Sequence, residues 1–158
     1  MRIYVASSWR NEQQPAVVAA LRGLGAEVYD YKNPAPGNHG FHWSAIDPAW
    51  KAWSPERFRE ALDHPIADGG FACDMTALYG CDVCVLVLPS GRSAHLEAGH
   101  AAGAGKKVIV LLAPGEPELM YKMTDYLCTS IDEVCSVVSF MMKVDRMASV
   151  TRRISATR

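Results

Sequence analysis

The sequence lacks the features of a membrane or nucleic-acid-coating protein. A membrane helix requires about 18 apolar residues, and the most apolar run here, residues 83–88, is much shorter. The amino-terminal stretch Met1–Val5 has too short an apolar region for a signal peptide and is expected to form a strand. Sixteen basic and seventeen acidic residues give a net charge of -1, without the basic excess typical of nucleic-acid binding. We therefore expect a cytoplasmic protein without membrane or nucleic-acid polymer partners.

Signals for disulfides, metals and cofactors are also scarce. The five cysteines are an odd number and are scattered, which favours free thiols. Cys81 and Cys84 form a C-x-x-C pair, but this pair runs into an apolar strand and lacks the second pair of a structural zinc site, so we expect both to pack in the core. His95 and His100 are five residues apart rather than four, so they do not form a helical metal pair. Gly69-Gly70 is expected to be a turn and lacks a dinucleotide-binding pattern. No metal or cofactor is expected.

The chain of 158 residues has the length of one domain, and 49% of its residues are hydrophobic, as is ordinary for a globular protein. We predict a single α/β domain over residues 1–145, with an aromatic-rich insertion at about 32–65. Residues 146–158 are expected to be a basic, flexible tail, because its four arginines are accompanied by no acidic residue.

Short apolar runs alternate with helical patterns along the chain. The pattern predicts strands at 2–6, 26–30, 83–88, 107–112 and 125–128. Helices are predicted at 15–24, 54–64, 70–79, 93–104 and 130–143. This alternation is typical of right-handed β-α-β crossovers. The fold class predicted is therefore α/β, a doubly wound five-stranded parallel sheet in the flavodoxin-like order, which is also Rossmann-like.

The turn after the predicted strand at residues 83–88 is the strongest candidate for a functional site. Ligands of open α/β sheets bind at the carboxyl edge, and Glu97 is the only acidic residue between Val83 and Gly115. If Ser93 caps the following helix, Glu97 lies one turn in, where the helix dipole favours an ionised carboxylate by about 0.3–1 kcal/mol. The N–H groups of residues 91–94 are placed to bind an anion. Spacing alone favours an ordinary surface glutamate near a helix start.

Residues 89–99, Pro-Ser-Gly-Arg-Ser-Ala-His-Leu-Glu-Ala-Gly, resemble the signature of the nucleoside 2-deoxyribosyltransferase superfamily, which includes 2'-deoxynucleoside 5'-phosphate N-hydrolases and CMP-type N-glycosidases. The resemblance implies that Glu97 is the catalytic nucleophile. A second similarity, over residues 74–83, implies that Asp74 contacts the nucleoside and assists proton transfer, and that Asp82 is structural. The implied substrate-binding residues are Ser8, Trp9, Arg10, Ser90, Gly91, Arg92 and Ser93.

The sequence also departs from this family. Several members have a tyrosine on the first helix that orients the nucleophile, and the helix predicted at 15–24 has none. Either Tyr4, Tyr29 or Tyr31 takes this role, or the role is absent. The insertion matches no known pattern, and its three tryptophans are expected either to fold over the pocket and stack on a base or to pack in the core or against a partner.

The resemblance implies cleavage of the N-glycosidic bond of a nucleoside or nucleoside 5'-monophosphate. In this mechanism a glycosyl-Glu97 intermediate is resolved by water, as in a hydrolase, or by a second base, as in a deoxyribosyltransferase. The implied partners are a small-molecule nucleoside or nucleotide and further copies of the chain, in a homodimer or higher homo-oligomer. The alternatives are a non-catalytic nucleotide-binding or sensing module on the same fold, and an FMN-binding protein.

Overall fold

The computed structural model describes residues 1–156, and its side chains as far as residue 149. Its centre is a five-stranded, all-parallel sheet in the order β2-β1-β3-β4-β5. The strands are β1 (Arg2–Ala6), β2 (Glu27–Asp30), β3 (Val83–Val87), β4 (Lys107–Leu111) and β5 (Tyr126–Cys128). This order confirms the predicted doubly wound α/β class.

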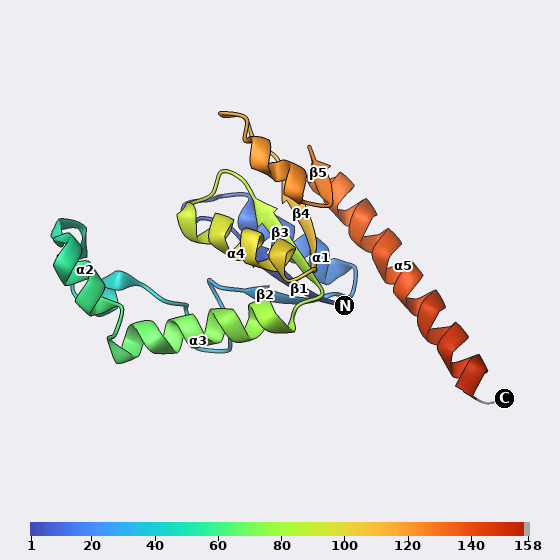
Figure 1. Ribbon diagram of the computed structural model, residues 1–158, viewed down its shortest axis with the longest axis horizontal. Helices are drawn as coiled ribbons and strands as arrows, with labels where there is room; N and C mark the ends of the chain where they lie inside the picture. Colours follow the sequence, from blue (N-terminus) through green and yellow to red (C-terminus); the bar gives the residue numbers. More distant parts are fainter. Residues whose placement is uncertain (157–158) are drawn as a thin grey trace.

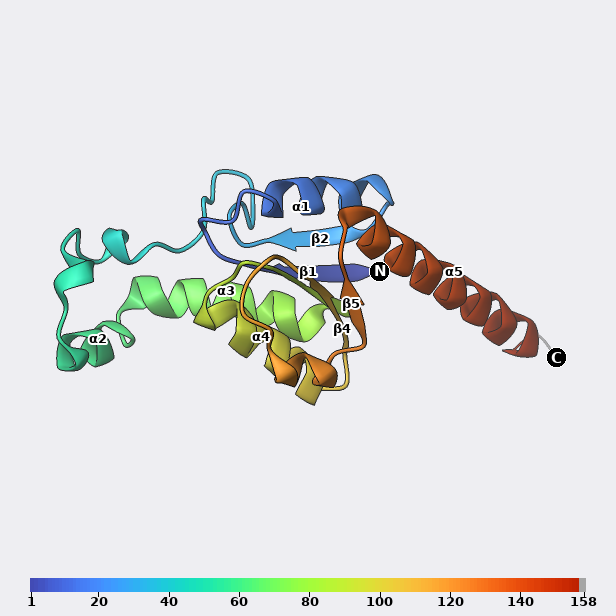
Figure 2. The ribbon, with the colours of Figure 1, turned by 90° about the horizontal axis from the view of Figure 1, so that it is seen from above.

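Helices cover both faces of the sheet (Figures 1 and 2). The α-helices are α1 (Gln14–Gly23), α2 (Pro55–Ala61), α3 (Pro65–Gly80), α4 (Arg92–Gly103) and α5 (Ile131–Ala156). Apolar side chains of α1 and α5 pack on one face, and those of α3 and α4 pack on the other. Residues in β3 are buried along the whole strand, as expected for a strand covered on both faces.

The small residues of α4 allow it to lie close to the sheet. Ala94, Ala98 and Ala101 are buried against it. Gly91, rather than the predicted Ser93, is the N-cap residue of α4, and Ser93 lies exposed in its first turn. Glu97 is therefore the sixth residue of the helix, beyond the first turn in which the helix dipole acts most strongly.

The predicted start of α3 was wrong. Proline was expected to end the preceding helix, and the two following glycines were expected to form a turn. Instead His64 caps α3 and Pro65 is its first residue, so Gly69 and Gly70 lie inside the helix. Proline is well suited to this first position because its missing N–H group would have no helical partner there.

The last helix is longer than predicted. The hydroxyl of Ser130 accepts a hydrogen bond from the N–H of Glu133 at 3.1 Å, as expected for a helix start. The Glu133 carboxylate accepts a hydrogen bond from the N–H of Thr129 rather than from that of Ser130. The helix α5 continues past the predicted end near Lys143, so residues 146–156 of the predicted tail are helical. Residues 157 and 158 lie outside the described part of the chain. The far end of α5 extends away from the sheet (Figure 1).

The insertion lies at the opposite end of the molecule from the end of α5, beyond the carboxyl edge toward which β2 points (Figure 2). It contains two short 3-10 helices, η1 (Trp43–Ala45) and η2 (Trp50–Ala52), followed by α2, which Ser54 caps as predicted. A third 3-10 helix, η3 (Leu119–Met123), precedes β5.

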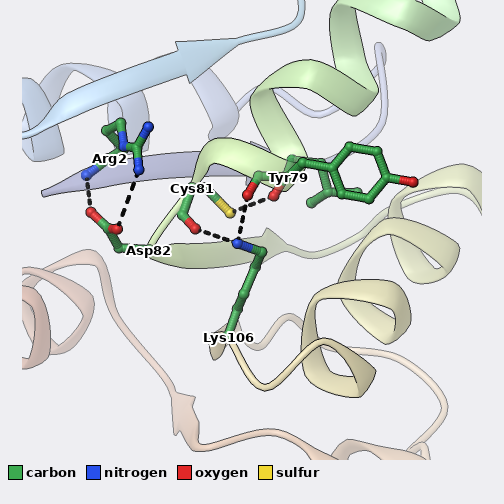
Figure 3. A network of polar contacts seen from close by, with 6 residues as sticks. Arg2, Tyr79, Cys81, Asp82 and Lys106 are labelled. Atoms are coloured by element: carbon green, nitrogen blue, oxygen red, sulfur yellow. Dashed lines mark hydrogen bonds and ion pairs between the residues drawn. The ribbon is translucent and has the colours of Figure 1, made fainter.

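A polar network at the amino edge of the sheet joins β1, α3 and the start of β4 (Figure 3). The Asp82 carboxylate accepts a hydrogen bond from the N–H of Arg2 at 2.7 Å. The ammonium group of Lys106 donates to the carbonyls of Tyr79 and Cys81 at 2.8 and 2.6 Å. These contacts give Asp82 a structural position, away from the carboxyl edge. Cys81 and Cys84 are buried free thiols, as predicted.

Candidate active site

Two carboxyl groups, Glu97 and Asp74, approach each other at the carboxyl side of the sheet. Glu97 comes from α4, which follows the central strand, and Asp74 comes from the middle of α3. Both side chains are partly buried, and they are close enough for the charge of Asp74 to act on Glu97. The fold therefore brings together the two residues predicted to be catalytic.

Two tyrosines on neighbouring strands complete this group. The rings of Tyr4 on β1 and Tyr29 on β2 are stacked, with centroids 5.3 Å apart. The hydroxyl of Tyr29 donates a hydrogen bond to Oδ1 of Asp74 at 2.7 Å and lies 3.3 Å from the sulfur of Cys73. The hydroxyl of Tyr4 lies beside Glu97. Among Tyr4, Tyr29 and Tyr31, Tyr4 is the tyrosine whose hydroxyl lowers the pKa of Glu97.

Burial and the neighbouring charge of Asp74 raise the pKa of Glu97 from 4.5 to about 7, and the Tyr4 hydroxyl partly opposes this. Burial also raises the pKa of Asp74, while the hydrogen bond from Tyr29 lowers it. The pKa of Glu97 is thus raised, whereas the helix dipole alone would favour the ionised form. Below about pH 7 the two carboxyl groups therefore share a proton, which lies on Glu97 while Asp74 is ionised.

Two buried hydroxyl groups near Glu97 have unused hydrogen-bonding capacity. Tyr4 is fully buried and Tyr31 is nearly so, yet neither hydroxyl makes a hydrogen bond of standard geometry. The charge of Glu97 helps to raise the pKa of both phenols, after the larger effect of burial. A buried polar group without a partner is costly, so each hydroxyl would gain from a hydrogen bond to the neighbouring carboxylate.

The first loop, between β1 and α1, contains the predicted residues Ser8, Trp9 and Arg10. The indole of Trp9 packs against the rings of Tyr31 and His42, with centroids 5.2 and 4.1 Å away. Trp9 therefore links the first loop to the insertion. The hydroxyl of Ser8 accepts a hydrogen bond from the N–H of Arg10 at 3.2 Å, and the Arg10 side chain is exposed.

The predicted residues of the second loop surround the start of α4. Gly91, Arg92 and Ser93 are exposed, and Ser90 is half-buried. The imidazole of His95 contacts this loop, with its Nδ1 lying 2.9 Å from the carbonyl of Gly91 and 3.3 Å from the Ser90 hydroxyl. Its Nε2 lies 2.9 Å from the Tyr121 hydroxyl. The free N–H groups of the first helical turn remain suited to an anion.

Asn11 is a positioning residue that the sequence analysis missed. Its side-chain amide donates hydrogen bonds to the carbonyls of Val87 and Pro89 at 3.2 and 3.0 Å. Its side-chain oxygen accepts from the N–H groups of Gln13 and Gln14 at the start of α1. Asn11 thus fastens the first loop, between β1 and α1, to the loop that contains Ser90. The only sequence signal was a polar amide directly before a helix, which is also common at ordinary helix caps.

A cavity of 230 Å³ opens between the insertion and α3, and Asp74 and Tyr29 lie at one end of it. A larger depression, on the exposed side of α5, is lined by that helix alone and includes none of the predicted site residues. The geometry therefore favours the smaller cavity, because Asp74, one member of the carboxyl pair, lines it. The aromatic cluster Trp43, Trp53 and Phe58 packs on itself rather than lining this cavity.

The arrangement suits proton transfer and nucleophilic chemistry. One of two neighbouring carboxyl groups can hold a proton while the other is ionised, which is the state required for attack assisted by a general acid. Within residues 1–156, no group of three or more histidine, cysteine or acidic side chains is arranged to hold a metal ion. No helix in this part of the chain is long and apolar enough to span a membrane.

No protein-family model matches the chain, and no curated protein is similar to it in sequence. Solved structures are similar. A 2-deoxyribosyltransferase from the psychrotolerant bacterium Bacillus psychrosaccharolyticus is 20% identical, over 85% of this chain and 90% of that chain, with a TM-score of 0.57. A CMP N-glycosidase from Clostridium botulinum is 18% identical, over 87% of this chain and 98% of that chain, with a TM-score of 0.48. The chain therefore has the flavodoxin-like fold of the Bacillus enzyme.

Proposed function

We propose that this protein belongs to the nucleoside 2-deoxyribosyltransferase superfamily and cleaves the N-glycosidic bond of a nucleoside or nucleoside 5'-monophosphate. The observation that carries the proposal is the carboxyl pair Glu97 and Asp74, placed at the carboxyl edge of the sheet with Tyr4 and Tyr29 beside it. The fold shared with a 2-deoxyribosyltransferase supports the same reaction class.

The shared proton first moves from Glu97 to Asp74, and in the first step the ionised Glu97 attacks C1' of the sugar. The new bond forms between a carboxylate oxygen and C1', and the bond from C1' to the base nitrogen breaks. The electron pair of that bond goes to the base, which takes the single proton of the carboxyl pair from Asp74. The products are a neutral base and a glycosyl ester on Glu97.

In the second step, water or a second base attacks C1'. The ester bond breaks, its electron pair returns to Glu97, and Asp74 takes the proton of the incoming nucleophile. Water gives the free sugar, and a base gives a new nucleoside. Asp74 thus acts first as an acid and then as a base, a role worth about 10²–10⁴-fold in rate.

The position of Tyr4 supports its assignment as a positioning residue. Its ring is held between strands by stacking on Tyr29, so its hydroxyl stays beside Glu97. A hydrogen bond from this hydroxyl would favour the ionised, nucleophilic form of the glutamate. The N–H groups at the start of α4, with Ser90, Arg92 and Ser93 around them, are proposed to bind a 5'-phosphate.

The test is release of free base from deoxynucleosides, nucleosides and their 5'-monophosphates, with and without a second base. We expect turnover in the native protein and none in Glu97→Gln. A glycosyl adduct on Glu97, detected by intact-protein and peptide mass spectrometry, would identify the intermediate directly.

The Glu97→Gln variant should remain folded, because glutamine removes a buried negative charge whose raised pKa disfavours the folded state above about pH 7. Its melting temperature is therefore expected to equal or exceed that of the native protein at pH 8. Full turnover in this variant would refute the nucleophile assignment. Ligand-dependent melting without base release at any pH would instead indicate a nucleotide-binding module.

A further inference from the structure

We propose that one face of α5 is a docking surface for the same face of α5 in a second copy of this chain, with the two helices antiparallel. The face is the one that forms the larger depression, which is lined by Asp132, Cys135, Ser136, Ser139, Phe140 and Lys143. No other element within residues 1–156 lines this depression. The inference is independent of the proposed function, because none of these six residues belongs to the carboxyl pair or lines the smaller cavity.

The docking face is accessible because α5 lies on the outside of the molecule. The opposite side of the helix packs into the core through Val134 and Val138, which are fully buried. Figure 2 shows α5 running outward from the sheet, away from α3 and α4. The depression has a volume of 490 Å³, and Phe140, which lines it, is 61% exposed. Aromatic side chains dominate the energetics of interfaces, so this ring is the apolar anchor of the face.

Opposite charges stand at the two ends of the depression. Asp132 and Lys143 are eleven residues apart, which is about three helical turns, so they share one side of the helix and lie about 16 Å apart along its axis. Both side chains are exposed, and neither makes an ion pair with another described residue. The face therefore presents one free negative and one free positive charge, in a fixed order along α5.

This charge pattern is complementary to itself in one orientation. When a second α5 lies antiparallel across the face, with the two-fold axis midway between the charges, Asp132 lies opposite Lys143 of the second copy and Lys143 lies opposite its Asp132. Parallel helices in register would instead bring like charges together. A two-fold contact uses the same patch on both copies, so every contact occurs twice. The antiparallel arrangement thus forms two ion pairs, one at each end of the contact.

The same axis places short side chains at the centre of the contact. Ser136 lies opposite Ser139 of the second copy, and Phe140 lies opposite Cys135. The distance between packed helices depends on the side chains at the contact, so the two serines allow a close approach. Each Phe140 ring then fills the depression of the other copy beside a short thiol side chain, and both rings are removed from water.

The experiment reverses the two charges, first singly and then together, and measures the mass in solution by analytical ultracentrifugation. A two-fold contact gives the native protein an even number of chains. Asp132→Lys and Lys143→Asp each place like charges opposite one another, so each should halve the mass at a concentration at which the native protein is fully assembled. The double variant exchanges the charges and should regain the native mass.

A mixture of the two single variants should also regain the native mass, because complementary charges then meet across the contact. This result separates a lost contact from misfolding, since a misfolded chain gains no partner on mixing. The matched control is Asp145→Lys, which makes the same charge change at an exposed position of α5 outside the depression. It should sediment as the native protein does, and melting temperatures should show that all variants are folded.

A native protein that sediments as a monomer, or native mass in either single variant, would overturn the docking surface. If neither the double variant nor the mixture regains the native mass, the antiparallel pairing of Asp132 with Lys143 is refuted. A halved mass in Asp145→Lys would also refute this face, because the loss would then follow any change of charge on α5. None of these results bears on Glu97-dependent release of base.

Discussion

At the scale of single residues, the chemistry of Glu97 depends on which groups surround its carboxyl. Burial and the charge of Asp74 raise its pKa to about 7, and the Tyr4 hydroxyl acts in the opposite direction. An acidic side chain on an exposed helix turn would remain ionised near its ordinary pKa. The environment therefore makes Glu97 and Asp74 a pair that shares one proton below about pH 7.

The shared proton predicts a bell-shaped dependence of kcat/KM on pH. The active form has one proton on the pair, so activity should fall as pH rises above about 7, where the pair loses that proton. It should also fall in acid, where Asp74 and Glu97 are both protonated. Base release measured between about pH 5 and 9 checks this. Activity that rises steadily to a plateau above pH 7 would contradict it.

Two variants separate the causes of that profile. In Asp74→Asn the general acid is lost, so activity should fall about 10²–10⁴-fold. The pKa of Glu97 also falls, so the remaining activity should rise with pH and should not decrease above pH 7.

In Tyr4→Phe the group that lowers the pKa of Glu97 is lost, so the decrease in activity above pH 7 should move to higher pH. A Tyr4→Phe profile that coincides with that of the native protein would show that the hydroxyl does not act on the glutamate.

At the scale of elements, the position of α3 determines where Asp74 lies. The helix starts at the cap formed by His64, and its last carbonyl groups are held by Lys106, which belongs to the turn before β4. A cation at a helix carboxyl terminus interacts favourably with the helix dipole as well as with the carbonyls. Lys106 thus couples the end of α3 to the central part of the sheet.

Lys106→Met should lower the free energy of unfolding by about 1–2 kcal/mol, because two hydrogen bonds from a charged group are lost. Denaturant unfolding measures the change. Lys122→Met on exposed η3 is the control and should change stability by less than about 0.5 kcal/mol. Equal stability of the two variants would show that the contacts of Lys106 with α3 contribute nothing measurable.

At the scale of the whole molecule, α3, α4 and η3 lie on the same side of the sheet (Figure 2). Large apolar side chains on these three elements remain exposed. Leu96 on α4 is 75% exposed, and Phe71 on α3 and Leu119 on η3 are also largely exposed. Exposed apolar side chains that gather on one face are typical of an interface between proteins. This face is therefore our candidate for contact between copies of the chain.

We expect the protein to sediment as a homo-oligomer, with a mass that is a multiple of 17.3 kDa. Leu96→Glu should shift the protein toward the monomer, because it places a charge in the apolar face. Leu62→Glu, at the end of α2 on the insertion, is the matched control and should leave the mass unchanged. Analytical ultracentrifugation of all three proteins decides the point, and a native protein that sediments at 17.3 kDa would contradict the proposal.

The sequence by itself determined the class of the sheet, since buried strands such as residues 83–87 are continuous apolar runs whatever surrounds them. It also indicated the turn that carries Glu97. Local pattern misplaced the starts of α3 and α4, because proline and glycine fit either the end or the beginning of a helix.

Only the tertiary structure decided which side chains meet. It placed the Tyr4 hydroxyl beside Glu97, joined Tyr29 to Asp74 across 45 positions of sequence, and laid the insertion against Gly70. Spacing along the chain carries no information about such contacts, because they depend on how separate elements pack. The pKa of Glu97 follows from the same packing, through burial and a neighbouring charge that come from other elements.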